Sequence, residues 1–219
     1  MNSKTKYIST VAMLCALAYI VMALIKIPLV PGLDFLKYEP KDIIVAIGGF
    51  IFGPFTAFVI SVIVSLIEML TVSTTGVIGL VMNVLSTCSF ACVAAIIYKK
   101  NKTIRGAFIG LLAGTLAMAA VMLLWNYFFT PVYMGVPRET VAKMLIPSFL
   151  PFNLLKGGIN MALTMLIYKP IVRALRLANL IPESSGVKAE KTKKIGYMIF
   201  AAVIFITCII LVLVLKNII

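Results

Sequence analysis

The sequence contains no histidine and only seven acidic residues among 219. Without histidine the chain cannot build a Ser-His-Asp or Cys-His arrangement, and its few carboxylates form no pair suited to acid–base catalysis. No GxxxxGK[ST] loop occurs, so the sequence does not predict ATP hydrolysis by this chain. We therefore expect no enzymatic activity, and the lack of candidate residues also disfavours an intramembrane enzyme.

Cysteine is scarce, and its positions exclude a second class of site. Cys15, Cys88, Cys92 and Cys208 each lie within an apolar run, and their spacing is not that of metal ligands. We expect them to be small core residues, with neither a metal nor a cofactor bound. The 20 basic residues gather in short loops rather than on a face with interleaved aromatics, so nucleic acid is not an expected partner.

Apolar length is what the sequence has in excess. Hydrophobic residues make up 62% of the chain, and its mean hydropathy is +1.12. A helix needs roughly 20 apolar residues to cross a hydrocarbon core of about 30 Å, and runs of that length occupy most of the chain. The sequence predicts an all-α integral membrane protein in the lipid bilayer, without a soluble domain.

The apolar runs predict five clear membrane helices and one ambiguous region. The ambiguous region, 42–71, is too long for one crossing and contains Gly53 and Pro54, which weaken a helix. The clear helices are 7–29, 76–97, 106–129, 147–168 and 195–215.

Basic residues decide between one crossing and two in the ambiguous region, because cytoplasmic loops carry the lysine and arginine excess. Two crossings and a cytoplasmic N-terminus put thirteen basic residues inside and six outside, with Lys156 within a span. We therefore predict a six-helix membrane domain at 1–175, a charged cytoplasmic linker at 176–194, and an extra transmembrane helix at 195–219. We expect this last helix to be an anchor or a packing helix.

Polar residues at similar depth predict a binding site near the outer surface. Asn153 and Lys156 lie about 9 and 14 Å into the sixth helix at 1.5 Å per residue, on one face. Asn126 and Tyr127 lie near the outer end of the fifth helix, and Asn83 lies on the fourth at a similar level. An ionisable residue within a span is costly and usually marks a site.

Structural alternatives exist for these residues. Lys156 could instead pair with Glu68 or extend its ammonium to the surface. Asn83 and Asn126 could serve as hydrogen-bonding contacts between helices. If they do share a pocket, its carboxamides, ammonium and aliphatic side chains suit a planar, largely apolar ligand with an edge of carbonyls and ring nitrogens.

Small residues at four-residue spacing mark two helix surfaces. Ala12 and Ala16 lie on the first helix, and Gly106, Gly110 and Gly114 lie on the fifth. Such spacing lets helices approach closely. For the glycines we favour packing within the bundle, whereas the alanine pair is equally compatible with packing and with a partner surface.

Three motifs together resemble a known family. "FLKYEPKD" follows the first helix, "WNYFFTPVY" ends the fifth, and "LPFNLLKG" lies in the sixth. In this order and at these spacings they resemble the riboflavin-specific substrate-binding S component of energy-coupling factor (ECF) vitamin transporters. The resemblance covers residues 4–173.

The resemblance implies a six-helix S-component bundle in a bacterial plasma membrane. Such a protein captures riboflavin from outside as its transported ligand and delivers it by toppling in the membrane. It implies a complex with a transmembrane coupling subunit, which the AxxxA pattern of Ala12 and Ala16 would contact, and with two ATPase subunits.

The resemblance also implies roles for single residues. Asn126, Asn153 and Lys156 would hydrogen-bond the isoalloxazine or ribityl groups, and Glu39 stands where the family often has aspartate. The chain departs from the family's pattern in its loop 130–144 and in its seventh span. The alternative functions are an S component for another planar vitamin-like solute and a secondary carrier, for which Glu68 is the available coupling residue.

Overall fold

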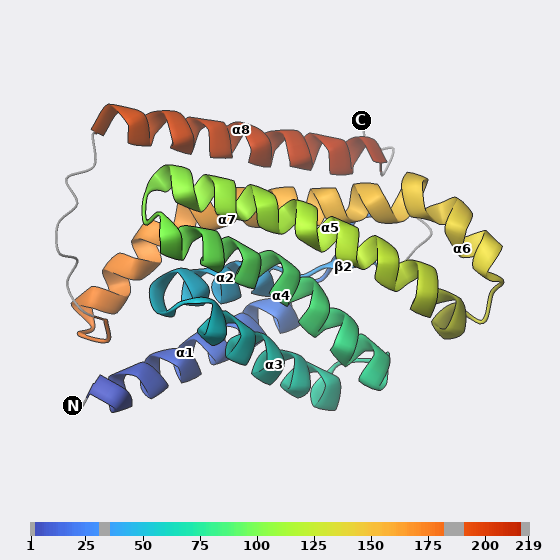
Figure 1. Cartoon of the computed structure of the whole chain (residues 1–219), viewed down its shortest axis with the longest axis horizontal. Coiled ribbons are helices and arrows are strands. Elements are labelled where there is room, and N and C mark those ends of the chain that lie inside the picture. Colours follow the sequence, from blue (N-terminus) through green and yellow to red (C-terminus); the bar gives the residue numbers. More distant parts are fainter. Residues whose placement is uncertain (1–2, 31–35, 182–190, 216–219) are drawn as a thin grey trace.

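The computed structural model describes residues 3–30, 36–181 and 191–215, and these residues are almost entirely helical (Figure 1). The helices are α1 (Ser3–Leu24), α2 (Lys41–Phe52), α3 (Pro54–Thr71), α4 (Gly76–Lys100), α5 (Ile104–Met134), α6 (Arg138–Met144), η1 (Leu145–Phe149), α7 (Leu150–Leu177) and α8 (Lys191–Leu215). The strands are β1 (Ile27–Pro28) and β2 (Lys37–Tyr38).

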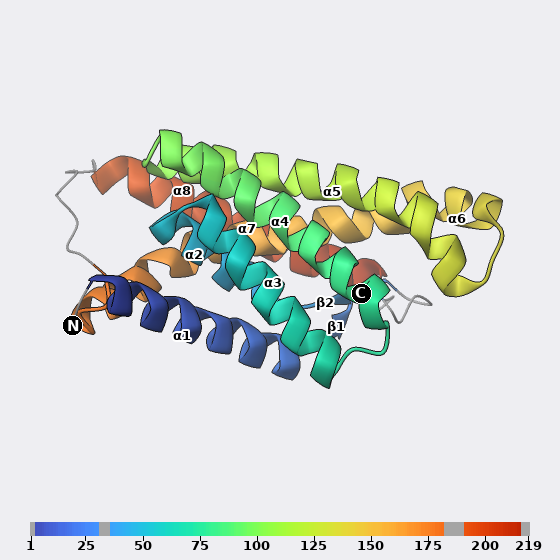
Figure 2. The same cartoon turned by 60° about the horizontal axis from the view of Figure 1, so that its bottom comes forward.

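Six helical segments in the described part of the chain are long and apolar enough to cross a membrane. They are α1, α3, α4, α5, the continuous α6–η1–α7 segment, and α8. The predicted all-α membrane protein is confirmed. In Figure 2, α1 and α3 lie side by side along one edge of the bundle.

The ambiguous region does form two helices, separated at the predicted glycine. Gly53 has φ 102°, which favours glycine, and Pro54 occupies the first turn of α3, where a proline is tolerated. However, α2 has only 12 residues and is about 18 Å long, which is shorter than the hydrocarbon core of about 30 Å. Ten of its residues are buried, because α2 packs inside the bundle.

The region predicted as a loop at 130–144 is mostly helical. Helix α5 runs through Pro131 and ends at Gly135, whose φ of 65° provides a left-handed C-cap. Helix α6 follows and leads into α7. A proline removes only one backbone donor, and Pro131 lies in the last turn of a long, well-packed helix, so it does not end the helix.

Other predicted boundaries shift by several residues. Helix α1 ends at Leu24 rather than residue 29, because the chain enters the antiparallel hairpin, in which Ile27 pairs with Tyr38. The predicted linker at 176–194 falls largely on residues outside the described ranges; within it, α7 continues to Leu177 and α8 begins at Lys191.

Glycines bring α5 into close contact with its neighbour α4. A Cβ added at Gly110 would lie 2.7 Å from the carbonyl oxygen of Ala94, and one added at Gly114 would lie still closer, at 2.4 Å, to the carbonyl oxygen of Phe90. The glycine spacing on α5 therefore serves packing within the bundle, the alternative that we favoured from the sequence.

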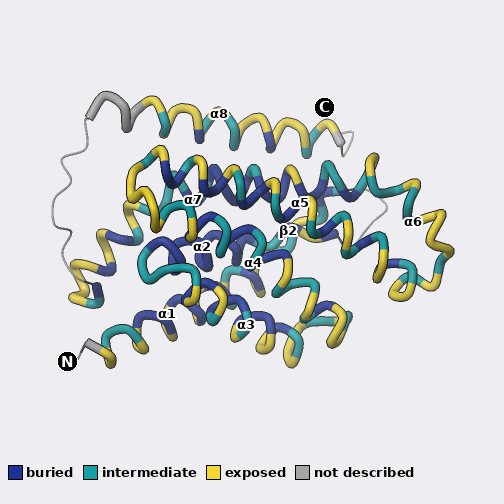
Figure 3. The backbone as a smooth tube through the Cα atoms, in the orientation of Figure 1, coloured by how far each residue is buried: buried dark blue, intermediate teal, exposed yellow. Residues whose placement is uncertain are grey.

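Helix α8 lies along α7 on the side of the bundle away from α1 (Figure 1). Most of its surface is exposed or half-buried, with few fully buried positions (Figure 3). Its buried residues include Ala201 and Cys208. All four cysteines are free thiols, and Cys15 and Cys208 are buried core residues as expected.

Candidate functional site

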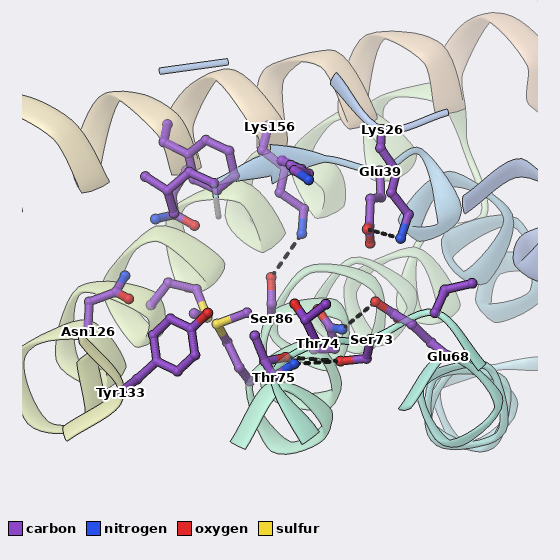
Figure 4. Close-up of a pocket in the computed structure, with 18 residues that line it drawn as sticks. Lys26, Glu39, Glu68, Ser73, Thr74, Thr75, Ser86, Asn126, Tyr133 and Lys156 are labelled. Atoms are coloured by element: carbon purple, nitrogen blue, oxygen red, sulfur yellow. Dashed lines mark hydrogen bonds and ion pairs between the residues drawn. The ribbon is translucent and has the colours of Figure 1, made fainter. Parts of the chain in front are cut away.

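A cavity of about 360 Å³ opens at one end of the bundle, where α1, α3 and α5 end and α4 and α7 begin. Figure 4 shows the side chains that line it. We call this the cavity end. The basic loop between α4 and α5 lies at the opposite end. The lining residues are Lys26, Leu36, Lys37, Glu39, Glu68, Val72, Ser73, Thr74, Thr75, Met82, Asn83, Ser86, Met122, Asn126, Tyr133, Phe152, Asn153 and Lys156.

Five of the six site residues expected from the sequence line this cavity, although they come from four separate segments. Asn153 and Lys156 come from the first turns of α7, Asn126 from α5, Asn83 from α4, and Glu39 from the segment after β2. The structure thus brings together residues that lie up to 117 positions apart in the chain.

Tyr127 is not among the residues that line this cavity. Its ring instead contacts Phe128, with ring centroids 5.1 Å apart, and the guanidinium of Arg138, which lies 5.5 Å from the ring centroid. Tyr133 lines the cavity in its place. It lies seven residues after Asn126 and therefore shares its helix face, a spacing that becomes informative once α5 extends past Pro131.

Lys156 is buried, with 7% of its surface exposed, and it is paired with an acid that was not predicted from the sequence as a site residue. Its Nζ lies 3.1 Å from Oδ2 of Asp42. It also donates to Oγ of Ser86 at 3.3 Å (Figure 4). The alternative pairing of Lys156 with Glu68 was wrong, because Glu68 pairs with Lys41 instead.

Asp42 has no exposed surface and accepts hydrogen bonds from two neighbouring helices. The hydroxyl of Thr87 on α4 donates to its Oδ1 at 2.6 Å, and Nδ2 of Asn160 on α7 donates to its Oδ2 at 3.2 Å. The Tyr38 hydroxyl donates to Oδ1 of Asn160 at 3.0 Å. Burial, together with the Asp42 carboxylate, raises the pKa of Tyr38, so the phenol remains the donor.

Lys41 is also buried, at 2% exposure, and joins two acids of the cavity wall. It is paired with Glu68 of α3 and with Glu39, whose Oε2 lies 3.3 Å from Nζ. Asn83 donates to Oε1 of Glu68 at 2.9 Å, and Lys26 lies 3.7 Å from Oε1 of Glu39. Lys41 was expected from the sequence to lie in an outer loop. The adjacent charges of Lys41 and Asp42, directly before an apolar run, were the sequence feature that could have indicated their role.

The charges around the cavity therefore form a balanced set. Buried charges are tolerated when they are paired and hydrogen-bonded, and each acid in this set lies beside at least one lysine. The lysines are Lys26, Lys41 and Lys156, and the acids are Glu39, Asp42 and Glu68. Lys37, at the rim, adds an exposed ammonium.

Several polar groups on the cavity wall keep hydrogen-bonding capacity. Oδ1 of Asn126 accepts from Thr130 at 2.8 Å, which leaves its NH₂ group without a partner among the described residues. Nδ2 of Asn153 donates to the Phe149 carbonyl at 2.8 Å, which leaves its carbonyl oxygen similarly open. Lys156 carries three N–H donors; it donates one to Ser86, and its ammonium is also paired with Asp42.

The rest of the wall is partly apolar, and the whole has the character of a small-molecule site. The volume falls in the range of about 300 to 1,000 Å³ that is typical of such pockets. Amide donors, an amide acceptor and an ammonium N–H match the carbonyls and ring nitrogens of a planar ligand. The apolar lining residues are Leu36, Val72, Met82, Met122 and Phe152.

The first helix presents a separate surface. Ala12 and Ala16 are both exposed on α1, on the same face as Met13 and Ile20, whereas Leu14 and Ala18 face the core. The structure therefore does not use the alanine pair for packing within the described bundle.

Comparison with protein families gives one match that covers most of the chain. Residues 6–168 match the family described as "ECF transporter, substrate-specific component". The match includes most of α1, all elements from α2 to η1, and most of α7, and α8 lies beyond it.

Three relatives are named as riboflavin transporters. Riboflavin transporter FmnP of Bacillus subtilis is 29% identical and covers 81% of this chain and 99% of its own length. RibU of Staphylococcus aureus is 27% identical, covering 79% and 94%. RibU of Lactococcus lactis subsp. cremoris is 30% identical, covering 74% and 79%.

A solved structure reported as the S component of a bacterial ECF transporter has a related fold. It superposes with a TM-score of 0.68 at 26% identity, and the match covers 79% of this chain and 99% of the solved one. About a fifth of this chain therefore has no counterpart in that structure.

Proposed function

Because the chain belongs to the family of substrate-specific components of ECF transporters, we propose that it binds riboflavin as the substrate-binding subunit of such a transporter. The observation that carries the proposal is the cavity itself. It joins Asn126 of "WNYFFTPVY" with Asn153 and Lys156 of "LPFNLLKG" in one wall of open donors and acceptors. The relatives named as riboflavin transporters give the ligand class.

The isoalloxazine ring of riboflavin suits this wall chemically. It is planar and largely apolar, and one edge carries two carbonyls, a ring N–H and ring nitrogens. The free NH₂ of Asn126 and a remaining N–H of Lys156 would donate to carbonyls or ring nitrogens, and the open carbonyl of Asn153 would accept the ring N–H. Glu39, Asn83 and the hydroxyls after α3 would receive the ribityl chain.

Transport would draw its energy from other subunits, because the chain has no nucleotide-binding loop. We place Ala12 and Ala16 at the contact with a transmembrane coupling subunit, which would assemble with two ATPases. The exposure of both alanines on α1 supports this assignment.

The proposed riboflavin site does not include Tyr127, because this residue does not line the cavity.

The orientation follows from charge. Basic loops favour the cytoplasm, and the basic loop between α4 and α5 lies at the end of the bundle opposite the cavity. We therefore place the N-terminus in the cytoplasm of a bacterial cell and the cavity at the outer surface of the plasma membrane, where the subunit would capture riboflavin.

A secondary carrier is the weaker alternative. It would need Glu68 to bind and release a coupling ion, yet this carboxylate is occupied by Lys41 and Asn83. An S component for another planar solute would differ from the proposed function only in its ligand. The riboflavin-binding test decides between these two S-component functions.

The test is a visible spectrum of protein purified in detergent from cells supplied with riboflavin, followed by quenching of added riboflavin fluorescence. We expect a flavin band at about one ligand per chain. Lys156→Ala and Asn126→Ala should each weaken binding about ten- to a hundredfold, because each removes a buried hydrogen bond to the ligand.

The matched control is Lys102→Ala, which removes an exposed lysine at the opposite end of the bundle and should leave affinity unchanged. A colourless protein that fails to quench riboflavin fluorescence contradicts the flavin assignment. Unchanged affinity in both site variants would show that riboflavin binds elsewhere.

A further inference from the structure

We infer that Asp42 is the positioning residue for Lys156, and that the adjacent charges Lys41 and Asp42 fix both polar walls of the cavity from behind. This inference rests on the proposed function, because it concerns how the same cavity holds its ligand. Neither residue lines the cavity, so both act through the side chains that do.

The two residues are placed where each requires its own partners. They occupy the first turn of α2 and are 2% and 0% exposed. A buried charge without a partner is strongly destabilising. Because consecutive residues in a helix point about 100° apart, Lys41 and Asp42 reach different parts of the bundle.

Asp42 is held in place by two hydrogen bonds that do not involve Lys156. Thr87 of α4 donates to Oδ1, and Asn160 of α7 donates to Oδ2. Asn160 is itself fixed by the hydroxyl of Tyr38. A carboxylate with two fixed donors offers the Lys156 ammonium a single preformed position, which is the arrangement that pre-organises a binding group.

The consequence for the ligand lies in the remaining N–H of Lys156. A lysine has a flexible stem and loses rotamer freedom when it is immobilised. With Asp42 paired to the ammonium and Ser86 accepting one of its hydrogens, the direction of the remaining N–H donors is set by the protein rather than by the ligand. The ion pair also neutralises the ammonium, so a ligand without charge can accept this hydrogen bond.

Lys41 serves the opposite wall in the same way. It joins Glu39 and Glu68, and Glu68 in turn accepts from Asn83. All three of these partners line the cavity. The first turn of α2 therefore connects α3, α4, α7 and the segment after β2 through ion pairs and hydrogen bonds.

A double-mutant cycle on riboflavin affinity tests the role of Asp42. We expect Asp42→Asn to weaken binding about tenfold or more in the otherwise unchanged protein. In a Lys156→Met background, Asp42→Asn should cause no further loss, because the residue through which Asp42 acts is gone. A purely structural role would reduce affinity by the same factor in both backgrounds, and that result would overturn the inference.

Glu68→Gln is the matched control, since Glu68 pairs with Lys41 and not with Lys156. Its effect and that of Lys156→Met should multiply. If Asp42→Asn does not fold, Thr87→Val replaces it: this variant removes one of the donors that hold Asp42 and leaves all charges in place. It should weaken binding only while Lys156 is present, and equal losses in both backgrounds would again overturn the inference.

The melting temperatures of the same four proteins, measured without ligand, test this inference separately from the proposed function. Wild-type protein that binds no riboflavin overturns the proposed function. The unfolding cycle then decides on the pair alone: Asp42→Asn should lower Tm less in the Lys156→Met background than in the wild type. Additive losses of Tm would show that Asp42 does not hold Lys156.

Discussion

Helices α1 and α8 lie on opposite sides of the bundle (Figure 1). Both carry exposed apolar residues on their outward faces. On α1 that face includes two alanines one turn apart, Ala12 and Ala16. On α8 it consists mainly of large side chains, among them Ile199, Ile206 and Ile210. Exposure alone does not mark a partner surface in a membrane protein, because lipid covers such faces equally well; small residues allow another helix to approach.

The inward face of α8 packs against two other helices. Helix α8 meets α7 at Gly158, where an added Cβ would lie 3.0 Å from the sulfur of Cys208. Near its start, Tyr197 and Phe200 contact Phe108 of α5, with ring centroids 5.9 and 5.6 Å apart. These contacts favour the interpretation of α8 as a packing helix, one of the two alternatives expected from the sequence, although α8 lies beyond the residues that match the family.

The largest expected effect comes from filling the small-residue surface on α1. Ala12→Phe combined with Ala16→Phe should reduce riboflavin uptake to background in cells that express the coupling subunit and ATPases, because the partner helix can no longer approach. Riboflavin binding by the purified variant should change less than about twofold, since neither alanine lines the cavity.

Ile210→Phe on α8 is the control for that variant, because it enlarges a side chain on an outward face that is already bulky. It should leave both uptake and binding intact. Uptake that survives the double alanine replacement would remove the contrast between the two helices.

A smaller effect, on thermal stability, is expected where α8 contacts Gly158 of α7. Gly158→Leu inserts a side chain where Cys208 already lies, and overpacking of this kind costs about 1 to 3 kcal/mol. We expect Tm to fall by several degrees in a melting curve followed by tryptophan fluorescence.

Gly196→Leu provides the comparison, because no atom lies within 4 Å of the position where its Cβ would be. This variant should melt at or above the temperature of the wild type, since leucine favours a helix more than glycine does. Equal melting temperatures for the two variants would mean that α8 is not held at Gly158.

The smallest effect is a covalent one. Gly158→Cys should form a disulfide with Cys208 on mild oxidation, because the new Cβ lies 3.0 Å from the Cys208 sulfur. Counting thiols by alkylation and mass spectrometry should show two fewer free thiols after oxidation. Riboflavin affinity should change less than about twofold, because α8 is already in this position. The same variant with Cys208→Ser should lose no thiols.

Much of the fold could be predicted from apolar length and basic loops, since both are properties of local sequence. The break at Gly53 was predictable for the same reason. The pairing of Lys41 and Asp42 was not, because local sequence places these residues at a loop boundary, and only the short, buried α2 carries them into the core. Periodicity would have selected Tyr133 over Tyr127 if the fifth helix had been predicted to continue beyond residue 129, as α5 does.

The polar wall of the cavity also bears on how such a sequence can diverge. Because Lys156 and Asp42 form a buried ion pair, removing one of the two charges strongly destabilises the folded protein, whereas removing both destabilises it much less. The same holds for Lys41 with its two acids. Substitutions at these positions should therefore be inherited together, and a descendant that loses the ammonium of Lys156 should also have given up the carboxylate of Asp42.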